Sequence, residues 1–120
     1  MNSSQTSGVC GMQQQKIDQI KEHLAKQFNL PAEQIEMLMP SFIATLQTHM
    51  ANLRQALAGD NPHAIGELGH TIKGAFLNLG LDECATIALE IELRGKAGDH
   101  LANYQQLYNA LHTTLLPNIE

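Results

Sequence analysis

The sequence predicts an all-α fold, a single bundle of packed helices. No segment alternates apolar and polar residues with a period of two, whereas apolar residues recur every three or four positions along most of the chain. Val9 is the single valine and aromatic residues make up 4% of the chain, a composition that suits helices packed through Leu, Ile and Ala better than a sheet. Short connections between the helical segments favour antiparallel neighbours.

Size and charge narrow the class of protein. At 120 residues, 43% of them hydrophobic, the chain is long enough for one domain with its own core. The formal net charge is −5, and the seven Lys and Arg residues are scattered rather than clustered. Because phosphate backbones are bound by an excess of Lys and Arg, we do not expect nucleic acid as a partner.

The first residues and the cysteines indicate the compartment. Residues 1–15 lack the basic and apolar regions of a signal peptide, and no apolar run approaches the length of a membrane span. The two cysteines, Cys10 and Cys84, show no metal-binding or redox spacing. We therefore expect a cytoplasmic protein without a disulfide or a membrane anchor, and a monomer, since no large apolar stripe is left over.

The small polar residues at the start, MNSSQTSGVCG, predict a flexible leader over 1–11, and the folded domain is expected over 12–120. A helix is predicted over 13–28, followed by a short helical piece over 31–39 that is broken or kinked at Pro40. Ser41 is the expected N-cap of the next helix, which ends at Gly59. The apolar positions that carry these helices are Ile17, Ile20, Leu24, Phe28, Phe42, Leu46, Met50, Leu53 and Leu57.

Three more segments complete the predicted bundle. Asn61 as N-cap and Pro62 in the first helical position start a helix that should run to Leu79 and close at Gly80. Asp82 and Asp99 are the expected N-caps of the two helices that follow. Their apolar positions are Cys84, Ile87, Ala88 and Ile91 in the first, and Leu101, Tyr104, Tyr108, Leu111 and Leu115 in the second.

The segment GHTIKGAFLNLG, residues 69–80, carries the strongest functional signal. On a helical wheel His70 lies opposite the apolar stripe, in the middle of the face that points to solvent. Lys73 follows one turn later on the same side. The stripe itself consists of Ile65, Leu68, Ile72, Ala75, Phe76 and Leu79.

Glycines surround this histidine although glycine destabilises a helix by about 1 kcal/mol relative to alanine. Gly66 and Gly74 lie one turn on either side of His70 on the same face, so we expect nothing bulky to shield the imidazole. Packing on an open face does not explain them, whereas close approach of another protein would. An uncharged imidazole is a nucleophile near neutral pH, and the Lys73 ammonium is suited to a phosphoryl oxygen.

The segment HTIKGAFLNLG resembles the signature of the histidine-containing phosphotransfer (HPt) domain, which is His-x-hydrophobic-Lys-Gly followed by small residues and a hydrophobic-Gly close. The resemblance extends over about 35 residues, through Leu81, Ile91-Glu92 and the KAGD segment (96–99). It implies an antiparallel four-helix bundle with additional N-terminal helices. The matching positions are His70, Ile72, Lys73, Gly74, Ala75, Asn78, Leu79 and Gly80.

The resemblance also implies a function. His70 would accept a phosphoryl group from a receiver-domain aspartate of a hybrid sensor kinase and pass it to an aspartate of a response regulator. Lys73 would steady the phosphoryl group, and Gly74 would leave room for the receiver. Apart from the resemblance, Gly66, Glu67 and Leu77 are further candidate binding residues, because they lie on the same helical face as His70. Such a domain acts as a phosphocarrier, with no kinase activity of its own and no cofactor.

Two positions depart from the family pattern, which has small residues where this chain has Phe76 and Leu77. Phe76 falls on the apolar stripe and is expected to fill the core. Leu77 lies on the His70 face and would either contact a receiver's apolar patch or narrow the choice of partner.

Two alternatives remain open from the sequence. A helical adaptor that binds receiver domains without phosphotransfer would share the same fold. A metal-binding bundle would use His63, Glu67 and His70, spaced i, i+4 and i+7, but no fourth ligand is evident and Lys73 would repel a cation. Glu90, Glu92 and Arg94 are interpreted as a solvated helix face.

Overall fold

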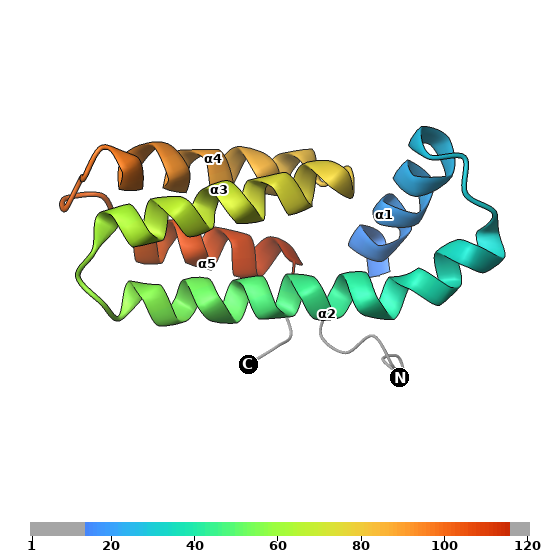
Figure 1. Ribbon diagram of the computed structural model, residues 1–120, viewed down its shortest axis with the longest axis horizontal. Helices are drawn as coiled ribbons and strands as arrows, with labels where there is room; N and C mark the ends of the chain where they lie inside the picture. Colours follow the sequence, from blue (N-terminus) through green and yellow to red (C-terminus); the bar gives the residue numbers. More distant parts are fainter. Residues whose placement is uncertain (1–13, 116–120) are drawn as a thin grey trace.

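The computed structural model describes residues 14–115, and the expected leader at 1–11 lies outside this range. Within it the chain is helical and contains no strand, which confirms the all-α prediction. Figure 1 shows α2 to α5 side by side as a bundle, with α1 across the N-terminal part of α2. The elements are α1 (Gln14–Gln27), α2 (Ala32–Leu57), α3 (Pro62–Asn78), α4 (Asp82–Lys96) and α5 (Tyr104–Leu115).

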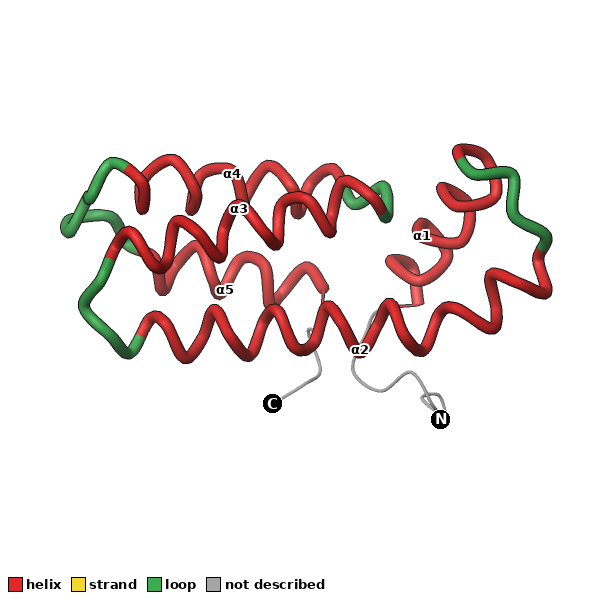
Figure 2. The backbone as a smooth tube through the Cα atoms, viewed as in Figure 1, coloured by secondary structure: helices red, strands yellow, loops and turns green. Residues whose placement is uncertain are grey.

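The connections make neighbouring helices antiparallel. Figure 2 shows the short loops of the bundle at alternate ends, so each helix returns along the one before it. The most extensive contact between two helices joins α3 and α4. The predicted four-helix bundle with an additional N-terminal helical part is therefore confirmed.

The core lies between the inner faces of the helices. Every helix contributes to it, and its largest fully buried side chain is Phe76. The prediction that Phe76 faces the core is confirmed. The other large side chains with less than 2% exposure are Ile20, Leu46, Leu53, Ile72, Leu81, Ile91, Leu111 and Leu115, together with the thiol of Cys84.

Of the two outcomes predicted at Pro40, a break or a kink, the break is wrong, because α2 continues through this residue. Pro40 lies on the exposed side of the helix, so the backbone carbonyl that loses its partner faces water rather than the core. Met39 and Ile43 on either side keep the buried stripe continuous. The N-terminal turns of α2 are tilted relative to the rest of the helix in Figure 1, as expected for a proline inside a helix. Ser41 is therefore an interior residue and not an N-cap.

Both predicted ends of α3 are confirmed. The Asn61 side chain accepts a hydrogen bond from the Ala64 N–H at 3.3 Å, and Pro62 follows in the first turn. At the other end Gly80 has φ of 76°, and the Leu81 N–H donates to the Phe76 carbonyl at 2.9 Å. This Schellman arrangement stops α3 and turns the chain directly into α4.

The starts of α4 and α5 differ from the prediction. Leu81, not Asp82, precedes α4, and Asp82 instead lies in the first turn, where its charge complements the helix dipole. The Asp99 carboxylate accepts the N–H groups of Leu101 and Ala102 at 2.9 and 3.2 Å, which builds a turn rather than a helix. The last helix therefore starts at Tyr104, and Leu101 is 95% exposed instead of facing the core.

Helix α1 packs against the turn between α3 and α4. The Gln19 side-chain amide donates to the Gly80 carbonyl at 3.0 Å, and Lys16 Nζ lies 3.5 Å from Glu83 Oε1. A Cβ at Gly80 would lie 2.4 Å from Cγ of His23, so α1 covers this turn closely. The turn that ends the helix carrying His70 is thereby held in place.

Candidate functional site

The outer face of α3 presents His70 to solvent. The His70 side chain is 61% exposed, whereas Ile72 and Phe76 on the inner face are fully buried. The wheel prediction for the direction of His70 is confirmed. Because both ends of α3 are capped and its inner face is packed, the helix fixes the direction in which the imidazole points.

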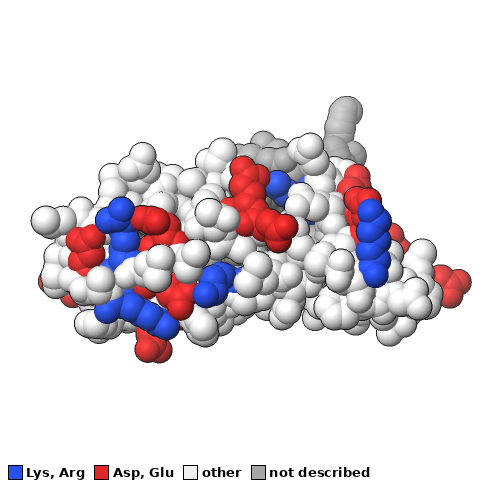
Figure 3. Space-filling model, turned by 90° about the horizontal axis from the view of Figure 1, so that it is seen from above, with Lys and Arg blue, Asp and Glu red and all other residues white. Residues whose placement is uncertain are grey.

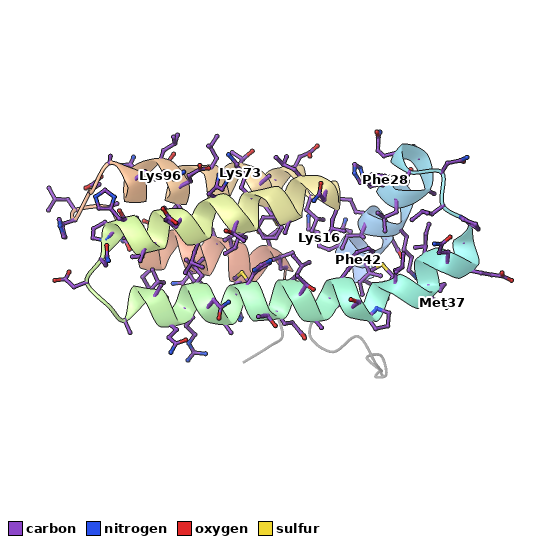
Figure 4. All side chains as sticks on the ribbon, viewed as in Figure 1. Lys16, Phe28, Met37, Phe42, Lys73 and Lys96 are labelled. Atoms are coloured by element: carbon purple, nitrogen blue, oxygen red, sulfur yellow. The ribbon has the colours of Figure 1, made fainter. Side chains whose placement is uncertain are left out.

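A carboxylate from the neighbouring helix lies against this imidazole. Glu92 of α4 is only 7% exposed, and its Oε2 lies 2.9 Å from His70 Nδ1 and 3.1 Å from Lys96 Nζ. Its Oε1 lies 2.8 Å from Lys73 Nζ. The prediction that Glu92 belongs to a solvated face is wrong, because α3 and α4 approach closely enough to enclose it. Figure 4 shows Lys73 and Lys96 on the same side of the α3–α4 pair.

These contacts keep Glu92 ionised. Its pKa is lowered from the ordinary value of 4.5 to about 2, mainly by the hydrogen bond from Lys73. Burial opposes this change, and the hydrogen bonds from Lys96 and His70 add to it. At neutral pH the group is therefore a carboxylate.

The carboxylate decides which nitrogen of His70 is free. A carboxylate only accepts hydrogen bonds, so Nδ1 must carry the proton that lies between it and Glu92. In the neutral ring the lone pair is then on Nε2, which has no hydrogen-bond partner within the described part of the chain. The arrangement presents an exposed nucleophilic nitrogen backed by a fixed negative charge.

The pKa of Glu92 predicts a pH-dependent contribution to stability. Because the folded state lowers this pKa, the ionised group stabilises the fold above about pH 4.5, and the contribution is lost as pH falls from 4.5 towards 2. We expect Glu92→Gln to lower the free energy of unfolding by about 1–2 kcal/mol at pH 7. Chemical denaturation of both proteins from pH 7 to pH 2 should show this difference shrinking.

The matched control is Glu22→Gln, since Glu22 is exposed and pairs with Lys26 at 3.0 Å on the surface of α1. This variant should differ little from wild type at any pH, because exposed ion pairs contribute little. A Glu92→Gln difference that stays constant down to pH 2 would show that the carboxylate is not stabilised in the folded state.

The glycines around His70 have two different explanations. Gly66 is buried, and a Cβ there would lie 2.7 Å from the Lys96 backbone N and 2.8 Å from the Gly95 carbonyl carbon. The expectation that Gly66 leaves the His70 face open for a partner is therefore wrong, because Gly66 lets α4 approach α3. Gly69 does the same beside Glu92, where a Cβ would lie 2.8 Å from the backbone N.

Gly74 behaves differently. A Cβ there would meet nothing within 4 Å, so no packing within the described residues requires a glycine at this position. Leu77, one turn further along, is 51% exposed, and Glu67 on the other side of His70 is also exposed. The surface beside Nε2 is therefore open towards the C-terminal half of α3.

No metal site forms at His63, Glu67 and His70. Within residues 14–115 no group of three or more His, Cys, Asp or Glu side chains is arranged to hold a metal ion. The metal-binding alternative therefore lacks a ligand set in this part of the chain. In the same range, no helix has both the length and the apolar character needed to cross a membrane.

Charge is mixed on the face that carries the site. Figure 3, which shows the molecule from above, has basic side chains next to acidic ones and no continuous basic area.

Sequence reasoning overlooked Glu92 and Lys96 as parts of the site. The sequence of α4 did contain a signal, a series of small residues around Glu92. Ala85 and Ala88 lie seven and four positions before Glu92, and Gly95 lies three positions after it. Small residues on one helical face mark a close approach of two helices, and a glutamate among them faces the neighbouring helix rather than water.

Comparison with known proteins gives one family and a small group of relatives. The family model described as Hpt domain matches residues 37–116. The phosphorelay protein LuxU of Vibrio vulnificus, strain YJ016, is 26% identical over 106 residues, which cover 86% of this chain and 87% of the relative. LuxU of strain CMCP6 matches with the same identity and coverage. No solved structure matches significantly.

Proposed function

The chain belongs to the Hpt domain family, and from this premise we propose that it is a histidine phosphotransfer protein of a two-component phosphorelay. His70 accepts a phosphoryl group from an aspartate in the receiver domain of a hybrid sensor kinase. It then passes the group to an aspartate in the receiver domain of a response regulator.

The geometry around His70 suits this chemistry. The lone pair of Nε2 attacks the phosphorus of an aspartyl phosphate, and the N–P bond forms while the bond to the aspartate oxygen breaks. The aspartate leaves as a carboxylate with the electron pair, and the imidazole becomes positively charged because Nδ1 keeps its proton. Glu92, 2.9 Å from Nδ1, stabilises that developing positive charge. Transfer to the second aspartate reverses these steps.

Lys73 is proposed to bind the phosphoryl oxygens. It lies one turn from His70 on the same helix, and its ammonium group is already held nearby by Glu92 Oε1 at 2.8 Å. A short movement away from the carboxylate brings this charge to a phosphoryl group on Nε2.

The surrounding surface suits a receiver domain. Gly74 leaves space beside Nε2, and Leu77, Leu89 and Leu93 are 51%, 38% and 57% exposed. Leu89 and Leu93 lie on either side of Glu92 in the sequence of α4, and Leu77 lies on α3. Both helices that form the site therefore also carry exposed apolar side chains. Exposed apolar groups next to a polar centre are typical of a protein-binding surface.

A single observation carries the proposal: an exposed imidazole whose inner nitrogen is held by a buried carboxylate. A receiver-binding adaptor without phosphotransfer needs the exposed surface but has no need for an imidazole whose Nδ1 is held by a carboxylate. The adaptor therefore remains the alternative that an experiment must distinguish.

The test is transfer of labelled phosphate from ATP through hybrid kinases of the source organism to the purified protein. We expect label that is stable in base and labile in acid, as for a phosphorus–nitrogen bond. The label should then move to a response-regulator receiver. Absence of label with every donor, while receivers still bind, would favour the adaptor instead.

Replacing Lys73 should slow transfer without abolishing it. We expect Lys73→Ala to lower the initial rate of labelling about tenfold, because one charge that stabilises the transferring phosphoryl group is lost. Lys26→Ala, which removes an exposed lysine from α1, should leave the rate unchanged. Equal rates for Lys73→Ala and wild type would remove Lys73 from the proposed site.

A further inference from the structure

We propose that the groove between α2 and α5 binds an acidic helical segment of a partner protein, and that Arg54 holds one of its carboxylates. In Figure 1 these two helices lie below the α3–α4 pair that carries His70. The inference does not depend on phosphotransfer, because it concerns a second surface of the same chain. A protein bound there would leave His70 accessible.

The groove exists because α2 and α5 contact each other less extensively than the other neighbouring helices of the bundle. It has a volume of about 790 Å³ and extends from Gln47 on α2 to Ala58 just after this helix. At a rise of 1.5 Å per residue, its length is about 16 Å, which corresponds to three turns of a bound helix. An open groove of this length between two helices suits a third helix better than a compact small molecule.

Arg54 lines this groove and has no partner. All seven Lys and Arg side chains lie within the described range 14–115, and six of them form ion pairs. In that range Arg54 forms neither an ion pair nor a hydrogen bond, and no residue one turn away on α2 is charged. Asp60, the acidic residue nearest to it in the sequence, lies instead 4.0 Å from His100. In a chain with a net charge of −5, this guanidinium is left open to a carboxylate from outside.

The other residues around the groove fit a helix that carries carboxylates. Among the described residues that line it there is no Asp or Glu, so no acidic group there repels such a ligand. Met50 and Ala51 provide apolar contact for one face of an amphipathic helix. On the α5 side, the Asn109 oxygen accepts a hydrogen bond from the Gln105 amide at 2.9 Å, so the N–H donors of Asn109 take no part in that bond.

Helix stability alone does not account for an arginine at this position. Arg54 lies in the last turn of α2, where any cation complements the helix dipole. A lysine would serve that purpose equally well, whereas the planar guanidinium of arginine binds a carboxylate through two parallel hydrogen bonds. Arg54→Lys therefore separates the two roles.

The test is an NMR titration of the isotope-labelled full chain with a synthetic peptide. The peptide is an amphipathic helix of about twelve residues with leucine on one face and glutamate on the other. We expect it to shift the amide signals of α2 and α5 along the groove and to leave the signals around His70 unchanged. Arg54→Gln should weaken binding about tenfold and Arg54→Lys about threefold. Arg94→Gln is the matched control, since Arg94 already pairs with Glu90 and Asp99 on another face, and it should leave the affinity unchanged.

A second variant tests the groove without removing Arg54. Ala51→Glu places a carboxylate three positions before Arg54 on the same helix, within reach of an ion pair. It should block the acidic peptide and leave the bundle folded, because Ala51 is exposed.

Three results would overturn the inference. The first is a wild type that does not bind the acidic peptide, or that binds it only at the α3–α4 surface. The second is equal affinity for a peptide with glutamine in place of glutamate, because Arg54 would then hold no carboxylate. The third is a shift of the groove signals that grows with protein concentration in the absence of peptide, which would assign the groove to a second copy of this chain.

Discussion

His70→Gln is expected to reduce labelling to the background of the assay while leaving the bundle folded. The glutamine side chain has no nucleophilic nitrogen, so no phosphorus–nitrogen bond forms. Its amide N–H can still donate to Glu92 in place of Nδ1, so the buried carboxylate keeps a partner. Because the His70 side chain is 61% exposed, we expect the free energy of unfolding to change by no more than about 0.5 kcal/mol. Circular dichroism and thermal denaturation measure this change.

His63→Gln is the matched control, since His63 is a second exposed histidine on α3. It should take up label at the wild-type rate. Label that persists on His70→Gln would place the acceptor elsewhere. A loss of the helical circular dichroism signal in His70→Gln would mean that His70 is needed for folding. The missing label would then not show that His70 is the phosphoryl acceptor.

Gly95→Ala is expected to destabilise the protein strongly, although alanine favours a helix by about 1 kcal/mol. A Cβ at residue 95 would lie 2.4 Å from both Cα and N of Gly66 and 2.6 Å from the Pro62 carbonyl oxygen. These neighbours are backbone atoms, so α3 and α4 must move apart. We expect a loss of about 2–4 kcal/mol in the free energy of unfolding, measured by chemical denaturation.

Gly74→Ala is the control for this substitution, because a Cβ there meets nothing within 4 Å. It should stabilise the protein by about 0.5–1 kcal/mol through helix propensity alone. If Gly95→Ala were also stabilising, α3 and α4 would be further apart than described, and Glu92 would not be enclosed. Below the unfolding temperature, Gly95→Ala should also slow labelling, because separating the helices moves Glu92 away from His70.

The parts of the fold set by local interactions were predictable from sequence. The direction of His70 follows from a repeat of 3.6 residues in α3, and Asn61 and Gly80 cap that helix through contacts with their immediate neighbours. The helical class itself followed from composition and periodicity. Such features depend on residues within a few positions of each other.

Features that depend on distant residues were not predictable in the same way. Pro40 predicts either a break or a kink, and only the buried contacts on both sides decide that α2 continues through it. Asp99 is a separate, local case: its carboxylate accepts the N–H groups of Leu101 and Ala102, and the residue type alone does not distinguish such a turn from the start of a helix. Gly66 reads as an opening on the His70 face and is instead filled by the backbone of α4. Glu92 belongs to the site only because that approach brings it to His70. The small residues of α4 indicate a close approach of two helices, but they do not identify the residue that Glu92 meets.

The tight turn between α3 and α4 has a consequence for how this chain can vary in length. Glu92 reaches His70 across the turn at residues 79–81, where Gly80 and Leu81 are bonded back to the last turn of α3. One residue inserted into the first turn of α4 would rotate the following residues by about 100° and carry the carboxylate away from the imidazole. An insertion in the loop at 97–103 lies beyond Glu92 and leaves this alignment intact. The site therefore tolerates insertions and deletions in the loop at 97–103, after α4. It does not tolerate them at the turn at 79–81 or in the first turn of α4.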